Sequence, residues 1–245
     1  MNVLLVSPQT PMTFWSAKHA VRFVSKRAAF PPVGLMTVAA MLPKEWNLRL
    51  IDMDVSRLRD ADLRWADYVL VSAMIVHKQS MLSDVIPRCK RLGKPIIGGG
   101  PLFTTGHEDY AADVHCVLGE CEETIAGVVR DMESGLLQAK YESGHGFPDV
   151  TQTPVPRFDL INPRHYATMS IQFSRGCPFD CEFCDIIVMN GRKPRTKTPE
   201  QMIAELDALD ATGWHGTVFF VDDNFIGNKK LVKGFLRALV AWRER

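Results

Sequence analysis

Three closely spaced cysteines, Cys177, Cys181 and Cys184, constrain this chain more than any other feature of its sequence. Their spacing is C-x3-C-x2-C, so all three thiols belong to one short loop. Thiolates at this spacing can converge and hold three irons of a four-iron cluster. The fourth iron then keeps an open coordination position, which substrate or cofactor chemistry requires and a closed structural site lacks.

The alternatives to an iron–sulfur cluster are a zinc site and a disulfide. A structural zinc site normally needs a second pair of ligands, and the nearest histidines, His165 and His215, are each isolated. A disulfide would leave one thiol of the trio unpaired, and the amino-terminal segment lacks the basic region of a secretory signal. The spacing therefore favours a cluster, with a zinc-stabilised interaction domain as the rival.

The residues before the cysteines add a second signal. A strand-like run at residues 169–174 leads directly into Arg175, Gly176 and the cysteine loop. With these flanks the segment resembles the radical S-adenosylmethionine (SAM) superfamily, in which such a loop follows the first strand of a parallel barrel. The resemblance implies that the three cysteines bind a [4Fe–4S] cluster whose open iron chelates SAM. It also implies that Phe183 packs near the adenine, although an ordinary core phenylalanine explains this residue equally well.

Composition sets outer limits on the function. The chain has 245 residues and a net charge of +1, so charge gives no reason to expect nucleic acid or an acidic membrane as a partner. Its long apolar runs, such as residues 68–76, have the length of strands and fall short of the ~20 residues of a membrane span. We therefore expect a cytoplasmic protein without a membrane span, with Cys89, Cys116 and Cys121 reduced and acting as small apolar residues.

Strand and helix signals alternate over residues 1–133. The runs that read as strands cover residues 3–6, 48–52, 68–74, 95–97 and 115–118. Helical patterns separate them, the clearest of which spans residues 81–89. Such alternation predicts βα units and a parallel sheet buried on both faces, which is an α/β, doubly wound, Rossmann-like domain.

Two further segments follow this domain. Glycine and proline punctuate residues 134–167, which predicts a linker. Residues 168–245 contain two strand–helix units, which the resemblance identifies as the first part of a radical SAM partial barrel. Because a full (β/α)8 barrel takes ~250 residues, we expect a carboxyl-terminally truncated enzyme with little turnover alone, or one that needs a partner chain to complete the barrel.

The carboxyl ends of the predicted strands carry candidate ligand contacts, because ligands of parallel α/β sheets bind at that edge. These candidates are Ser72, Gly98, Gly99, Gly100, Gly119 and Glu120. Three successive glycines let a bulky ligand approach the backbone, although they also make a tight turn. Upstream of a radical SAM loop, this domain resembles the amino-terminal cobalamin-binding domain of cobalamin-dependent radical SAM proteins, which implies that these residues contact cobalamin.

No histidine ligand to cobalt is expected from this chain. The D-x-H-x-x-G signature of other cobalamin proteins starts at Asp113 and His115, but Leu118 occupies the position of the glycine.

Two adjacent carboxylates, Asp222 and Asp223, follow the second strand of the second segment. In the superfamily, polar groups at that position bind the methionine amino group of SAM, and a carboxylate suits an ammonium partner. An Asx cap on the following loop explains these residues as well.

The leading hypothesis is a cobalamin-dependent radical SAM methylase. The stretches at residues 191–195 and 220–228 resemble the branch that includes hopanoid and bacteriochlorophyll-type methylases. The resemblance implies a [4Fe–4S] cluster, SAM and cobalamin as cofactors, a flavodoxin- or ferredoxin-like reductant, and a small-molecule substrate, lipid or tetrapyrrole-like, methylated at an unactivated carbon. The alternative is a non-catalytic cobalamin- or cluster-binding module that acts as a carrier or sensor.

Overall fold

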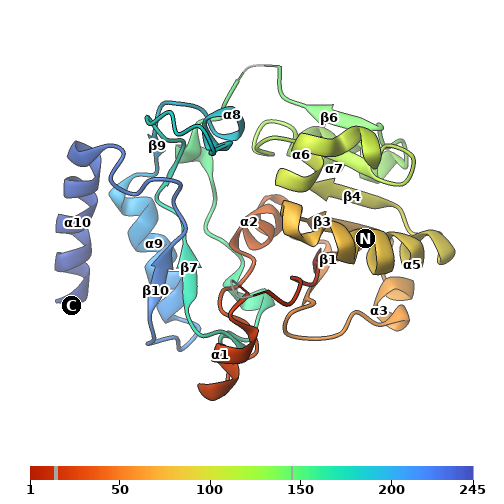
Figure 1. Ribbon diagram of the computed structural model, residues 1–245, viewed down its shortest axis with the longest axis horizontal. Coiled ribbons are helices and arrows are strands. Elements are labelled where there is room, and N and C mark those ends of the chain that lie inside the picture. The colour runs from red at the N-terminus through yellow and green to blue at the C-terminus, as the bar shows by residue number, and fades with distance from the viewer. Residues whose placement is uncertain (14–15, 145, 245) are drawn as a thin grey trace.

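A computed structural model describes residues 1–13, 16–144 and 146–244. The first part of the chain forms a six-stranded parallel sheet of order β2-β1-β3-β4-β5-β6 (Figure 1). The strands are β1 (Asn2–Ser7), β2 (Asn47–Asp52), β3 (Tyr68–Ser72), β4 (Ile96–Gly99), β5 (His115–Leu118) and β6 (Lys140–Glu142). The predicted α/β class and parallel sheet are confirmed.

Helices cover both faces of this sheet because successive side chains of each strand point to opposite faces. Leu4 and Val6 pack toward one helix layer, and Val3 packs toward the other. The first layer contains α3 (Asp60–Trp65), α5 (Ile86–Arg91) and α6 (Pro101–Gly106). The second contains α2 (Val33–Met41) and α7 (Ile125–Ser134). The short helices α1 (Lys18–Phe23) and α4 (Lys78–Ser80) lie in the loops after β1 and β3.

The segment after α7 is more structured than a linker. Its strand β6 pairs with β5, so the first sheet extends beyond residue 133. Only Tyr141 of this three-residue edge strand is buried, which is too little apolar pattern for a strand to be read from sequence. Farther along, Phe158 and Tyr166 are buried in the core of the second part of the chain.

The second part contains two βα units. β7 (Met169–Ile171) and β10 (Val218–Phe220) are parallel, and α9 (Pro199–Asp210) and α10 (Lys229–Arg243) pack beside them. Both helices begin at side-chain caps: the Thr198 hydroxyl accepts from the Gln201 amide at 3.2 Å, and the Asn228 side chain accepts from the Leu231 amide at 3.3 Å. The predicted pair of barrel units is therefore present.

A small antiparallel ribbon joins the two ends of the cysteine loop. It consists of β8 (Ser174–Arg175) and β9 (Arg195–Thr196), and the loop between them contains α8 (Ile186–Met189). Gly176 lies at the start of the loop with a φ of 91°. A Cβ there would lie 2.8–2.9 Å from three backbone carbonyl oxygens of residues 190–193, so only glycine fits.

No helix within the described residues has both the length and the apolar character to cross a membrane.

Candidate functional site

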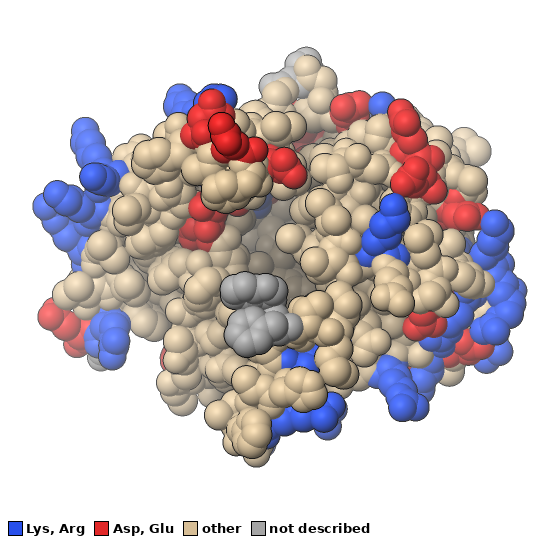
Figure 2. Space-filling model, in the orientation of Figure 1, with Lys and Arg blue, Asp and Glu red and all other residues tan. Residues whose placement is uncertain are grey.

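A cavity of about 190 Å³ lies at the carboxyl edge of the sheet of the first unit, the part of the chain that forms the six-stranded sheet. Gln172, Arg175 and Lys197 of the second unit, which holds β7 and β10, also line it. Helices α2 and α7 and strands β3, β4 and β5 enclose it. Its walls are mainly apolar, with contributions from Val38, Met41, Leu70, Ile97, Val117 and Val128. Figure 2 shows the molecule hollowed between its two units, with acidic side chains beside the hollow. A cavity at this edge is where parallel α/β sheets bind ligands.

Five of the six residues predicted to contact cobalamin line this cavity, namely Ser72, Gly99, Gly100, Gly119 and Glu120. The sixth, Gly98, does not line it: a Cβ there would lie 2.7 Å from Phe103 and Val114, so this glycine is required by helix packing. Gly99 has no neighbour closer than 3.8 Å to its Cβ position, which leaves its backbone open toward the cavity.

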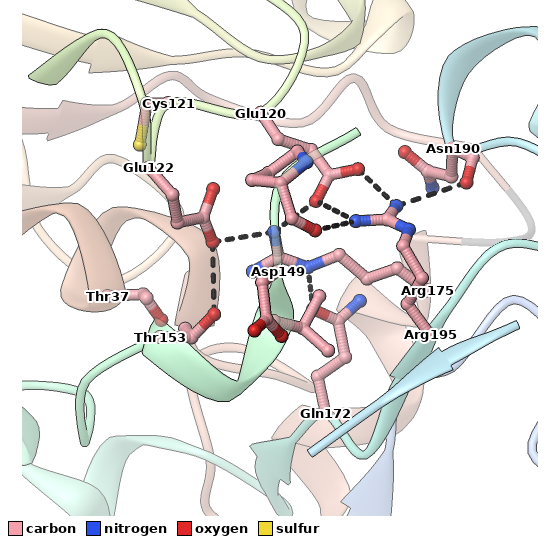
Figure 3. Close-up of polar contacts among 12 residues, drawn as sticks. Thr37, Glu120, Cys121, Glu122, Asp149, Thr153, Gln172, Arg175, Asn190 and Arg195 are labelled. Atoms are coloured by element: carbon pink, nitrogen blue, oxygen red, sulfur yellow. Dashed lines mark hydrogen bonds and ion pairs between the residues drawn. The ribbon is translucent and has the colours of Figure 1, made fainter. Parts of the chain in front are cut away.

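Charged side chains from the two units meet at the rim of the cavity (Figure 3). Glu120 Oε2 lies 2.6 Å from Arg175 Nη1 and 3.0 Å from Arg195 Nη1. Glu122 Oε1 accepts from Arg175 Nη1 at 2.7 Å and from the Thr153 hydroxyl at 3.1 Å. We call these four charged residues, Glu120, Glu122, Arg175 and Arg195, the rim network.

The rim network holds its charges in a largely dry environment. The side chains of Glu120 and Glu122 are 8% and 7% exposed, and that of Arg175 is 14% exposed. Burial alone would lower the pKa of Arg175, but the carboxylates of Glu122 and Glu120 outweigh it and raise this pKa above its ordinary value. The guanidinium therefore stays charged.

A second buried ion pair, between Lys197 and Glu205, lies at the wall of the cavity. Lys197 lines the cavity, and its ammonium contacts Glu205 Oε1 of α9. Burial raises the pKa of Glu205, while the nearby Lys197 charge opposes that rise. This pair fixes the segment that follows β9 against α9.

The three cysteines of the loop are free thiols, with Cys181 exposed and Cys177 and Cys184 half-buried. The Asn224 amide lies 3.5 Å from Cys177 Sγ as a hydrogen-bond donor. Among the described residues, no group of three or more His, Cys, Asp or Glu side chains is arranged to hold a metal ion. The donor set has the thiols and the hydrogen bond to sulfur that a cluster requires, but the convergence of the thiols remains a prediction from their spacing.

Phe183 is 91% exposed, so the structure excludes the alternative that it is an ordinary core residue. It lies in the turn between Cys181 and Cys184, where its ring is free to contact a ligand of the loop.

The two aspartates after β10 bind the backbone of the cysteine loop. Asp222 accepts from the Ser174 hydroxyl at 2.6 Å and from the Phe173 amide at 3.2 Å. Asp223 accepts from the Gly176 amide and from the Asn190 side chain, each at 2.8 Å. Burial raises the pKa of Asp222, and its hydrogen bonds from Ser174 and Phe173 oppose that rise. The aspartates therefore hold the start of the cysteine loop in place, instead of capping the loop that follows them. Their contact with SAM stays a prediction.

None of the described histidines lines the cavity. His115 begins β5 and so lies at the amino end of the sheet, where its Nδ1 is 2.7 Å from the Gln138 carbonyl oxygen. His77 is buried, with Nδ1 accepting from the Met74 amide at 3.1 Å and Nε2 lying 3.3 Å from the Thr10 hydroxyl. That no histidine of this chain ligates cobalt stays a prediction.

Four further residues belong to the site although they were not among the predicted cofactor contacts, namely Arg175, Arg195, Glu122 and Gln172. One signal was available for Arg175, because it directly precedes Gly176 and the cysteines. Arg195 belongs to the basic stretch of residues 191–195 that carries the family resemblance, but its position opposite Arg175 depends on the ribbon.

Two family models match the chain. One, described as the B12 binding domain, covers residues 22–129, and the other, the radical SAM superfamily, covers residues 171–243. This chain is a radical SAM protein with a B12 binding domain. The predicted cofactors, cobalamin, SAM and a [4Fe–4S] cluster, are the ones that these two matches support.

Two curated proteins are similar to this chain over its whole length. An uncharacterized methyltransferase of Synechocystis sp. is 44% identical over 100% of this chain and 46% of its own length. The Hopanoid C-2 methylase of Rhodopseudomonas palustris is 38% identical over 100% of this chain and 47% of its own length. The chain thus spans about half the length of these curated relatives.

A solved structure shows the same fold. TsrM, a radical SAM methyltransferase from Kitasatospora setae, has a TM-score of 0.72 and 18% identity. The similarity covers 99% of this chain and 51% of that one.

Proposed function

We propose that this radical SAM protein is the cofactor-binding part of a cobalamin-dependent methylase. The observation that carries the proposal is the contact between its two sites. The cavity in the B12 binding domain ends at Glu120 and Glu122, and their partner Arg175 lies two residues before Cys177. A ligand of the cavity and a ligand of the cysteine loop would therefore occupy adjacent sites.

The cavity suits the aromatic base of cobalamin. Its apolar walls match a flat heterocycle, and burial of apolar surface stabilises such a complex by roughly 25 cal/mol per Å². The open backbone at Gly99 and Gly119 allows close approach of the bulky ring system. Ser72 supplies a hydroxyl at the same edge.

The cysteine loop suits a cluster with an open iron. We propose that Cys177, Cys181 and Cys184 hold it, that Asn224 donates to the Cys177 sulfur, and that Asp222 and Asp223 orient the loop backbone. Phe183 is exposed where it can pack on the adenine of SAM. When bound, the cofactors supply the radical and the methyl group for transfer to an unactivated carbon.

Likeness to the Hopanoid C-2 methylase favours a polycyclic lipid as substrate, with a tetrapyrrole as the other option. Within the described residues, β10 pairs only with β7, and two strands cannot enclose a substrate. We therefore propose that this chain binds the cofactors but turns over little substrate until further strands, in the same protein or a partner chain, pair with β10. A small reductant protein would donate the electron.

Electron paramagnetic resonance on the anaerobically reconstituted, reduced chain tests the proposal. We expect a four-iron signal that shifts when SAM is added and disappears in Cys181→Ala. Cys89→Ala, a change at a buried cysteine outside the loop, should keep the signal.

The rival functions predict different results. One zinc and no iron per chain would favour the interaction domain, and a cluster indifferent to SAM would contradict the proposal. Formation of 5′-deoxyadenosine by the chain would count against a non-catalytic carrier or sensor.

A further inference from the structure

We propose that Glu120 and Glu122 hold together, or lock, the two ends of the cysteine loop, which we call its neck. Filling the cavity and ordering the loop are then energetically coupled. The identity of the two ligands rests on the proposed function, but the lock itself rests on the contacts of the rim network. Its residues belong to separate units of the fold and meet at one point (Figure 3).

The neck is the ribbon of β8 and β9, which brings the two ends of the loop together. The Cys177 amide donates to the Gly191 carbonyl at 3.1 Å, just inside the ribbon. Arg175 and Arg195 are direct partners across the two strands. Like charges opposite each other in an antiparallel pair are destabilising, so the ribbon by itself would tend to open.

Glu120 removes this repulsion because it lies between the two guanidinium groups. Its Oε2 accepts from Arg175 at 2.6 Å and from Arg195 at 3.0 Å, and its Oε1 accepts from Arg195 a second time. The pairing with Arg195 uses both carboxylate oxygens, which is the stronger and more directional form of this interaction. A carboxylate of the first unit is thus part of the neck of a loop in the second.

Glu122 binds the same guanidinium nitrogen of Arg175 as Glu120 does. It accepts from Arg175 Nη1 at 2.7 Å, while Gln172 accepts from Arg175 Nε at 2.9 Å. Two carboxylates balance two guanidinium groups in a largely buried place. Removing one partner leaves an uncompensated charge, which is much more costly than losing a surface ion pair.

The same two glutamates line the cavity, and they lie one and three residues after Gly119, whose φ is 68°. A ligand that fills the cavity restricts the segment of residues 119–122 and with it the carboxylates that close the neck. Linkage is reciprocal, so ordering of the loop by its own ligands must raise affinity in the cavity by the same factor.

Hydrogen exchange tests the lock without any cofactor. Glu120→Gln keeps the shape of the side chain but removes its charge, and Glu123→Gln, which changes an exposed carboxylate bonded to Ser143, is the matched control. In Glu120→Gln we expect the amides of Cys177 and Lys197 to exchange about tenfold faster or more. Unchanged exchange at both amides would overturn the lock.

Titration with hydroxocobalamin tests the coupling. In the wild-type chain we expect the dissociation constant to fall by about 5- to 150-fold when the cluster and SAM are present. Arg195→Met breaks the network from the side that does not line the cavity, so it should bring this ratio close to one. Arg195→Met also replaces Glu120→Gln should that variant fail to fold.

The outcomes separate the two proposals. If hydroxocobalamin does not bind the wild-type chain at all, the proposed function fails, and the exchange experiment still decides the lock. If it binds with the same dissociation constant with and without cluster and SAM, the coupling is overturned while the proposed function stands.

Discussion

The two units of the molecule differ in how fully helices and neighbouring strands cover their sheets. In the first, helices cover both faces of the sheet, and the short strand β6 (Lys140–Glu142) forms one of its edges. In the second, two parallel strands are covered by α9 and α10, and β10 has an unpaired outer edge among the described residues. The difference teaches that the sheet of the first unit is covered on both faces, while the second unit keeps a strand edge to which further strands can pair.

The second unit also depends on the first for its core. Ala28 and Met36, which lie before α2 and on it, are buried together with Phe158, Tyr166 and Phe235. Asp52, at the end of β2, accepts a hydrogen bond from Tyr166 at 3.1 Å. These contacts predict that the two units unfold together, although only the first has a sheet covered on both faces.

Removal of a buried ring from either unit gives the largest expected effect. Phe103→Ala in the first unit and Phe235→Ala in the second each delete a fully buried side chain. Each should lower the free energy of unfolding by about 3–5 kcal/mol. In urea denaturation followed by circular dichroism, both variants should shift one common transition. A separate early transition in Phe235→Ala alone would break the idea that the units unfold together.

The second-largest effect is expected from adding a methyl group at Gly176, at the start of the cysteine loop. Gly176→Ala places a Cβ against three carbonyl oxygens at a φ of 91°, and such backbone strain costs about 1–3 kcal/mol. We expect iron incorporation after anaerobic reconstitution to fall sharply. The control Gly234→Ala, in the interior of α10 with free space around it, should stabilise the protein by about 0.5–1 kcal/mol. Equal iron content in the two variants would contradict the structural role of Gly176.

The smallest expected effect on stability concerns Asp52, whose contact with Tyr166 joins the two units and depends on pH. Burial raises the pKa of Asp52 to about 6, although the Asp54 amide and the Tyr166 hydroxyl oppose the rise. The folded state therefore binds more protons than the unfolded chain between about pH 4 and pH 6, and stability falls as pH rises through this window. Over this pH window, the free energy of unfolding of Asp52→Asn should fall by about 1–3 kcal/mol less than that of the wild type. If the urea midpoints of wild type and variant change with pH in the same way between pH 4 and pH 7, the raised pKa of Asp52 is contradicted.

Much of the fold could be predicted because its signals are local. The buried strands of the first unit are short apolar runs that end in glycine or polar residues, and the caps at Thr198 and Asn228 mark both helix starts. The edge strand β6 and the ribbon of β8 and β9 were not predicted. Both are two or three residues long, so they carry no periodicity, and their pairing partners lie far away in the sequence or across a loop.

Within the site, the sequence by itself determined the cysteine spacing, the glycines at the carboxyl edge of the sheet and the presence of two carboxylates after β10. Only the tertiary structure decided what several of these residues do. It turned Gly98 toward Phe103, tied Asp222 and Asp223 to the loop backbone and joined Glu120 to Arg175 and Arg195. The physical reason is that backbone conformation and ligand type are local properties of a residue, whereas a charge network depends on which distant groups share a buried space.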